Sequence, residues 1–283
     1  MGNDNKRPFL GSRGVLMKRV VLNTDIFGDP DDIYALLFLL SSKKIKIEMI
    51  ITSDEHNCGR AAYTKKFLNE LGINIPVFCG EDLGNKICYF APKTKEKINK
   101  KYVDAIKMLD DGFTYLCISP QSELAKVANI LKKKKANIII MGGSTKKQEH
   151  NIKCDIPAAR KVLKAKLAAK WIPSDLTVNN KIKIDKKHPL YKKITKSKTI
   201  AAKYLKENTD LFFKNLYPDH FLHDPLAISI LLDSKIIKFQ NKKLELKKAQ
   251  FIPSKEGFSI QYGINADYNR FLKLFNTQIK KWI

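Results

Sequence analysis

The sequence has few of the features that mark secreted, membrane-bound or zinc-binding proteins. Its five cysteines show neither a CxxC pair nor a Cys/His ligand spacing, which argues against a disulfide framework or a zinc site. Cys79 and Cys117 lie within apolar runs and are expected to be small core residues. The longest uncharged apolar run, IYALLFLL, is far shorter than the roughly 18 residues that a membrane span requires. These absences favour a protein of the reducing cytoplasm.

The first sixteen residues have neither the apolar segment nor the small-residue cleavage site of a signal peptide. We therefore expect residues 1–16 to be a disordered extension outside the fold. The remaining residues, 17–283, are long enough and apolar enough to form one large α/β domain with a sizeable core.

Arginine is scarce in a chain whose formal net charge is +25. Only six of the 53 basic residues are arginines, and the lysines are spread over the chain in runs such as 132–135. Arginine is the residue that contacts bases and phosphates through paired hydrogen bonds. We interpret most of the charge as solvated surface and do not expect a nucleic-acid partner, although a polyanion site is the alternative.

Short apolar runs alternate along the chain with segments of helical spacing. Strands alternating with helices predict βαβ units around a largely parallel sheet that is covered by helices on both faces. After about residue 180 the pattern loosens into a Lys-rich helical stretch and a pair of strands over residues 242–263. The expected earlier strands are 19–25, 46–54, 75–80, 113–120 and 136–143, and the clearest expected helices are 31–42, 61–72 and 122–135.

Polar residues follow most of the predicted strands. Asn23 and Asp25 close the first, residues 53–55 (Ser-Asp-Glu) follow the second, residues 119–123 the fourth and residues 141–144 the fifth. Because open parallel sheets bind ligands at the carboxyl ends of their strands, we expect these residues to converge on one acidic crevice.

The segment NTDIFGDPDDIYALLFLL, residues 23–40, places Asp25, Asp29, Asp31 and Asp32 within eight residues. Carboxylates gathered at one point cannot all stay ionised without a counter-charge, and a hard divalent cation such as Ca²⁺ supplies one. The simpler interpretation is an acidic helix start, where these aspartates cap the helix and favour its dipole. That interpretation leaves Asp25 unexplained, because this residue precedes the turn and ends a buried strand.

Four segments, in order, resemble signatures of the inosine-uridine-type nucleoside hydrolases. NTDIFGDPDDIYAL resembles the family's Asp-Thr-Asp-Pro-Gly-x-Asp-Asp-Ala, with a turn two residues longer. SPQSELA is similar to Gly-Pro-Leu-Thr-Asn-Leu-Ala, and IIIMGGS followed by EHNIKCDIPAA resembles Met-Gly-Gly and Glu-Phe-Asn-x-x-x-Asp-x-x-Ala-Ala. HDPLAI matches the C-terminal His-Asp-Pro. The resemblance spans residues 18–235 and implies the α/β nucleoside hydrolase fold.

The resemblance implies calcium-dependent hydrolysis of the N-glycosidic bond of ribonucleosides to ribose and free base, without an organic cofactor. Asp25 would be the general base for the attacking water, and His223 the proton donor or hydrogen-bond partner of the departing base. The remaining implied roles are Ca²⁺ ligation by Asp25, Asp32, Asp224 and the backbone carbonyl of Ser122, contact with the ribose 2′- and 3′-hydroxyls by Asp31, and contact with its 5′ side by Glu149 and Asn151.

Four departures from the family pattern affect this implied site. Asn23 stands at the usual first Asp, and Asp54 with Glu55 replaces a Gly-Asn pair whose Asn contacts the sugar, so a contact there falls to Asp54 or is lost. The longer turn leaves Asp29 as a rival to Asp31. His150 replaces the Phe of Glu-Phe-Asn.

These departures keep open the alternative of a ribose- or nucleoside-binding protein that has lost turnover. The resemblance favours a homodimer or homotetramer.

Overall fold

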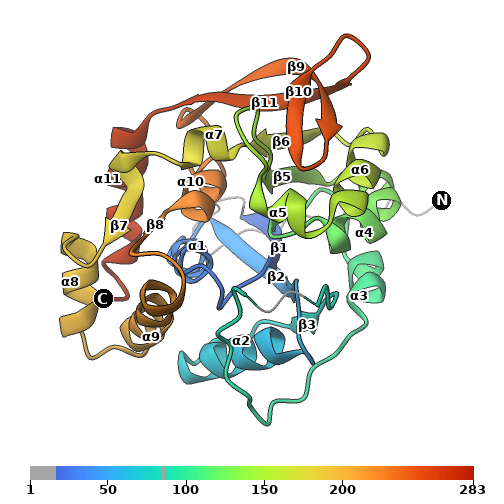
Figure 1. Cartoon of the computed structure of the whole chain (residues 1–283). Coiled ribbons are helices and arrows are strands. Elements are labelled where there is room, and N and C mark those ends of the chain that lie inside the picture. Colours follow the sequence, from blue (N-terminus) through green and yellow to red (C-terminus); the bar gives the residue numbers. More distant parts are fainter. Residues whose placement is uncertain (1–16, 85–86) are drawn as a thin grey trace.

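The computed structural model describes residues 17–84 and 87–283, so the expected extension 1–16 lies outside the described residues. Its centre is a nine-stranded sheet in the order β10-β9-β11-β6-β5-β4-β1-β2-β3, and β7 pairs with β8 in a small separate sheet (Figure 1). The strands are β1 Lys18–Thr24, β2 Ile45–Thr52, β3 Val77–Cys79, β4 Thr114–Ile118, β5 Asn137–Met141, β6 Ala169–Ile172, β7 Lys183–Asp185, β8 Asp219–Phe221, β9 Ile237–Lys247, β10 Gln250–Pro253 and β11 Phe258–Ala266.

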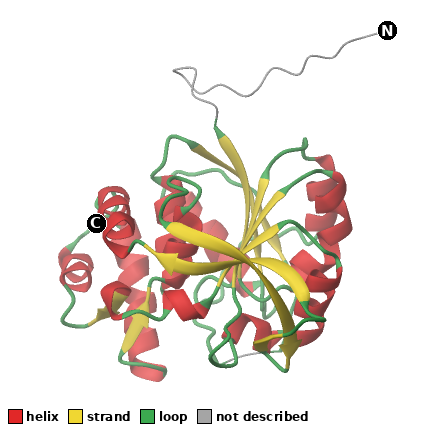
Figure 2. Ribbon diagram, turned by 90° about the horizontal axis from the view of Figure 1, so that it is seen from above, coloured by secondary structure: helices red, strands yellow, loops and turns green. Residues whose placement is uncertain are grey.

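Helices cover both faces of the sheet, as the sequence predicts (Figure 2). The helices are α1 Asp31–Leu40, α2 Gly59–Glu70, α3 Tyr102–Met108, α4 Ser122–Lys133, α5 His150–Cys154, α6 Ile156–Lys164, α7 Ser174–Thr177, α8 Pro189–Lys196, α9 Ile200–Asn215, α10 His223–Ser229 and α11 Tyr268–Ile279, with a short 3-10 helix, η1, at Asn180–Ile182. No helix in the described part of the chain is long and apolar enough to cross a membrane.

The alternation of side chains along β1 separates the two halves of the core. Val20 and Leu22 pack into one apolar cluster with α1, α9, α10 and α11, while Val21, between them, packs into the other with α4 and α6. Successive side chains of a strand point to opposite faces of the sheet, so a buried central strand is apolar on both. The predicted parallel arrangement is confirmed: β1 pairs in parallel with both β2 and β4.

Helix α1 is buried along nearly its whole length, from Asp31 to Leu39. It contacts α10, α11 and α9 in addition to β2. A helix surrounded in this way must be apolar on all sides, which accounts for the run IYALLFLL. The same burial carries the aspartates of its first turn into the protein interior.

Two details differ from the sequence-based expectation. The segment expected to form two strands over residues 242–263 contains parts of three, because β9, β10 and β11 form an antiparallel extension of the sheet. In addition, the structure joins Cys58 and Cys79 by a disulfide, so the expectation of no disulfide is wrong for this pair. These cysteines meet because α2 packs on β3 beside β2. The remaining cysteines, Cys88, Cys117 and Cys154, are free thiols.

Candidate functional site

The acidic residues of the predicted crevice are positioned by two helix starts and one strand end. Asp25 directly follows β1, Asp31 and Asp32 open α1, and Asp224 is the second residue of α10. Between strand and helix the chain turns through Phe27, whose φ of 67° is left-handed. α1 and α10 are neighbours, so their first turns face one another above the carboxyl edge of the sheet.

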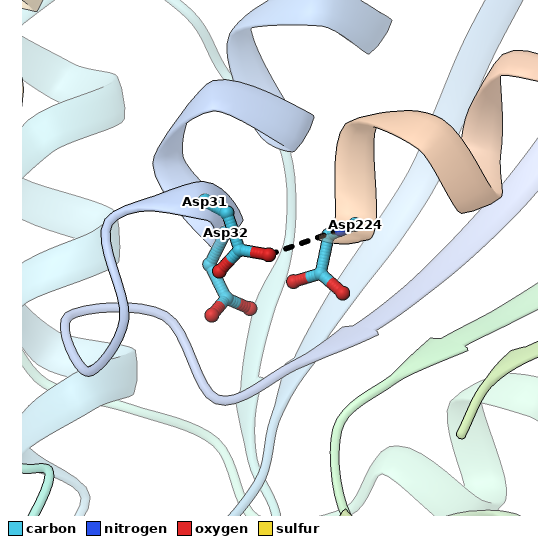
Figure 3. Close-up of side chains that lie close together, drawn as sticks. All are labelled: Asp31, Asp32 and Asp224. Carbon is cyan, nitrogen blue, oxygen red and sulfur yellow. Dashed lines mark hydrogen bonds between the residues drawn. The ribbon is translucent and has the colours of Figure 1, made fainter. Parts of the chain in front are cut away.

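Asp31, Asp32 and Asp224 form a cluster of three carboxylates (Figure 3). One oxygen from each lies within 4.8 Å of the others, and all three residues are buried. The Asp224 backbone N–H donates to Asp31 Oδ2 at 3.0 Å, and the Thr24 hydroxyl donates to Asp32 Oδ1. These bonds fix the orientation of two of the carboxylates.

Burial raises the pKa of each carboxyl in this cluster well above its ordinary value, and the neighbouring acidic charges raise it further. For Asp32 these charges are those of Asp25 and Asp31, and for Asp224 that of Asp31 is the largest. A divalent cation would remove this repulsion, and carboxylate oxygens are the donors that hard cations prefer. The cluster therefore fits the metal that the family resemblance implies, although its geometry alone does not select Ca²⁺.

The cluster contains two of the four predicted calcium ligands, Asp32 and Asp224, while its third member, Asp31, is the predicted ribose ligand. Asp25 is half-buried and close enough for its charge to raise the pKa of Asp32. Burial raises the pKa of Asp25 itself, against the lowering effect of the Arg60 guanidinium and of His150. The Ser122 side chain is directed to Asp155, to which its hydroxyl donates at 2.7 Å.

Asp29 contributes to the start of α1. Its Oδ1 accepts a long hydrogen bond of 3.4 Å from the Asp31 N–H, as a residue at a helix start does. His220 Nδ1 lies 3.7 Å from the same oxygen. Burial raises the pKa of Asp29 to about 8. Asp29 lies outside the three-carboxylate cluster.

Asn23 and Glu123 explain one departure from the family pattern. Asn23 Nδ2 donates to Glu123 Oε2 at 3.2 Å, and the Tyr115 hydroxyl donates to Asn23 Oδ1 at 3.1 Å. The family signatures have Asp at position 23 and Asn at position 123, so here the acid and the amide have exchanged places. Burial raises the pKa of Glu123 to about 7. The carboxyl that the family pattern places on β1 thus stands on α4 in this chain, as Glu123, and it is hydrogen-bonded to Asn23.

Two predicted sugar ligands have structural partners. The Glu149 carboxylate accepts backbone N–H groups from Asn151 and Ile152, both at 3.0 Å, and from Gly143 at 3.1 Å, so it caps α5 and holds the preceding loop. Asn151 Nδ2 donates to the Met141 carbonyl at 3.3 Å. Both side chains lie at the carboxyl end of β5, where the sequence predicts them, but their contacts include no residue of the carboxylate cluster.

His223 opens α10 next to Asp224 and lies 2.6 Å, Nδ1 to Oγ1, from Thr177. Burial, aided by the charges of Lys147 and His150, lowers its pKa to about 3. The imidazole is therefore neutral at neutral pH. Where the Thr177 hydroxyl donates to Nδ1, the ring carries its proton on Nε2 and can donate it in a hydrogen bond.

Arg60 is a residue that sequence reasoning missed. Its side chain is buried at the start of α2, and its guanidinium donates to the Asp25 carbonyl and lies 3.7 Å from Asp54 Oδ2. Glu55, one of the residues that depart from the family pattern, accepts the Arg60 and Ala61 N–H groups and so caps α2. The sequence did offer one signal for it, because arginine is rare in this chain and Arg60 comes shortly after the acidic pair Asp54 and Glu55.

Comparison with known proteins assigns the chain a family model. The model described as inosine-uridine preferring nucleoside hydrolase matches residues 20–269. None of the curated proteins compared with the chain matches it in sequence.

Solved nucleoside hydrolases share the fold at low sequence identity. A purine-preferring ribonucleoside hydrolase from Gardnerella vaginalis is 19% identical with a TM-score of 0.75, over 93% of this chain and 98% of that one. An inosine-uridine preferring nucleoside hydrolase from Bacillus anthracis is 16% identical with a TM-score of 0.74, over 94% and 100%. A plant nucleoside hydrolase is 17% identical with a TM-score of 0.73, over 93% and 98%.

The acidic site predicts a specific dependence of stability on pH in the presence of a chelator. The folded pKa of Asp29 is about 8 against 3.8 ordinarily, and those of Asp31, Asp32 and Asp224 are also raised. Between these values the native state holds protons that the unfolded state has lost. The free energy of unfolding therefore falls as pH rises from about 4 to about 8 through the titration of Asp29, and the raised pKa values of the other three carboxyls act in the same direction.

Thermal melts at about pH 5 and about pH 8, with chelator and with added Ca²⁺, measure this dependence. We expect Ca²⁺ to raise the melting temperature more at the higher pH, because the carboxylates bind it only when ionised. Asp224→Asn should reduce both the pH dependence and the effect of Ca²⁺. Identical melts under all four conditions would contradict a metal site here.

Proposed function

We propose, from the premise that this chain belongs to the inosine-uridine preferring nucleoside hydrolase family, that it hydrolyses ribonucleosides to ribose and free base with Ca²⁺ as its metal. Members of this family are N-glycosyl hydrolases, and the chain is an enzyme of that class. The observation that carries the proposal is the buried cluster of Asp31, Asp32 and Asp224 at the carboxyl edge of the sheet. One solved relative is named for a preference for purine ribonucleosides and another for inosine and uridine, so the proposal covers both classes of base.

The proposed ligands of the metal are Asp25, Asp32, Asp224 and the carbonyl of Ser122, and Asp31 is assigned to the ribose 2′- and 3′-hydroxyls. When bound, the cation would polarise the attacking water. Asp25 is proposed to take the proton of that water as it attacks C1′, while the surrounding carboxylates stabilise an oxocarbenium-like transition state. Glu149, Asn151 and Asp54 are the proposed contacts with the rest of the sugar.

His223 is proposed to assist departure of the base. Its lowered pKa disfavours the imidazolium form, so the neutral ring would act by donating a hydrogen bond from Nε2 to the leaving base. Thr177 would hold this tautomer through Nδ1. Of the two roles that the sequence left open for His223, proton donor or hydrogen-bond partner, we therefore propose the second.

A reducing-sugar assay over a panel of purine and pyrimidine ribonucleosides tests the proposed activity. We expect ribose to be released in Ca²⁺ and the rate to fall in excess chelator, with recovery when Ca²⁺ is restored. Release that survives chelation would contradict the metal requirement. Nucleoside binding without any release would favour the alternative of a binding protein that has lost turnover.

Asp25→Asn and Asp29→Asn separate the general base from its neighbour. Asp25→Asn keeps the shape and one coordinating oxygen but removes the charge and basicity, so we expect kcat to fall by about 10²-fold or more and nucleoside binding to change by less than about tenfold. Asp29→Asn should cost no more than a helix-cap effect of about 1 kcal/mol. Turnover and binding are measured separately in saturating Ca²⁺. A greater loss of turnover in Asp29→Asn than in Asp25→Asn would mean that the roles of the aspartates in the turn after β1 have been assigned wrongly.

His223→Ala is expected to slow hydrolysis of ordinary nucleosides by roughly 10²–10⁴-fold, because their bases leave poorly without assistance. It should matter far less for nitrophenyl riboside, whose leaving group needs no hydrogen bond. His223→Gln, which keeps a donor, serves as the intermediate variant. Equal losses on the two substrates would give His223 a purely structural role.

A further inference from the structure

Arg60 connects three segments that are far apart in the sequence. Its Nε donates to the Asp54 carbonyl at 3.0 Å, its Nη1 to the carbonyls of Asp25 and Ile26, the latter at 2.9 Å, and its Nη2 to the Cys88 carbonyl at 2.7 Å. The side chain is fully buried. A buried guanidinium is stable only when its donors are satisfied, and here four of its five N–H groups donate to backbone oxygens while Asp54 Oδ2 lies 3.7 Å from Nη2.

The segment of residues 88–90 is packed against the turn after β1 through this arginine. The Phe90 N–H donates to the Phe27 carbonyl at 2.8 Å, and the Tyr89 ring lies 4.7 Å from the guanidinium carbon of Arg60. Gly28 permits the close approach, because a Cβ there would come within 2.8 Å of the Cys88 oxygen and 3.2 Å of Arg60 Nη1. The turn that carries Asp25 and segment 88–90 therefore share one cationic anchor.

We propose that Arg60 is a positioning residue for the reaction, which sets the place of Asp25 by holding its backbone and fastens segment 88–90 to the same turn. This inference rests on the proposed function for its kinetic consequence, while the anchoring of segment 88–90 stands independently of any activity. The Arg60 guanidinium contacts the main-chain carbonyl of Asp25. Arg60 therefore affects the reacting atoms through Asp25.

Lysine is a poor substitute for this arginine. An ammonium group is a single point of charge, whereas the planar guanidinium spreads its donors over a fork that here reaches carbonyls on separate segments. A displacement of about 1 Å of a reacting group costs roughly 10²-fold in rate. Loss of the fork should therefore lower kcat more than it raises KM.

The test compares Arg60→Met and Arg60→Lys with wild type and with Arg160→Met, which changes an exposed arginine on α6. The first readout is turnover in saturating Ca²⁺. We expect kcat to fall by about 10²-fold or more in Arg60→Met with KM within about tenfold, and Arg60→Lys to recover less than about tenfold of that loss. Arg160→Met should behave as wild type.

The second readout needs no activity: the rate at which iodoacetamide alkylates Cys88, followed by peptide mass mapping with buried Cys117 as internal reference. Both Arg60 variants should alkylate at Cys88 several-fold faster than wild type. Gly28→Ala, which crowds the same contact without removing the guanidinium, should do the same and serves if Arg60→Met fails to fold.

The two readouts fail in distinguishable ways. A wild-type protein that releases no ribose overturns the proposed function, and the Cys88 rates still decide whether Arg60 anchors segment 88–90. Unchanged Cys88 alkylation in the folded Arg60 and Gly28 variants overturns the anchor. An unchanged kcat in Arg60→Met, beside an active wild type, overturns the positioning of Asp25.

Discussion

Burial of like charges at the carboxyl edge of the sheet is the constraint on which the rest of the site depends. Asp31, Asp32 and Asp224 are almost fully removed from water, and the charge of the Arg60 guanidinium offsets the surrounding negative charge at Asp32 only in part. Ionised carboxylates in such surroundings cost several kcal/mol each unless they are paired. Part of this cost is offset because the three carboxylates lie at the starts of two adjacent helices, where the helix dipoles and the Asp224 N–H reduce their repulsion. The remainder is what a bound cation would offset.

The environment of the cluster shows how the same constraint can be met by different residues. In the family signatures an Asp at position 23 is matched by an Asn at position 123, and in this chain Asn23 donates to Glu123. In this chain the amide stands on β1 and the carboxyl on α4, and a hydrogen bond joins them. Acids at both positions would face each other at this distance and repel. The departure at Asn23 is therefore balanced by a second departure, and it does not by itself argue for loss of activity.

The order of strands and helices, the parallel sheet and the convergence at its carboxyl edge could be predicted, because they follow from local periodicity and from the handedness of βαβ connections. The proximity of Asp31, Asp32 and Asp224 could also be predicted, since each lies in a short motif, while the roles assigned to them stay predictions. The pairing of Cys58 with Cys79 and the contacts of Arg60 were not, because they join segments whose proximity is set only by packing. The capping role of Glu149 was likewise hidden, because a motif gives a residue's place but not its hydrogen-bond partners.

The loop between β2 and α2, which precedes Arg60, contains several residues in unfavourable backbone conformations. Asp54, Asn57 and Cys58 all have left-handed φ values, between 48° and 58°, without being glycine. Each such conformation costs of order 1 kcal/mol and persists only where the surroundings impose it. In this loop the surroundings that impose it include the disulfide to Cys79, the Glu55 carboxylate at the start of α2 and the Arg60 guanidinium, which donates to the Asp54 carbonyl. Since Arg60 also binds the Asp25 carbonyl, the strained loop and the turn of the acidic cluster are held by one side chain. Asp54 and Glu55, which stand where the family pattern has Gly-Asn, thus belong to the structure that supports the site.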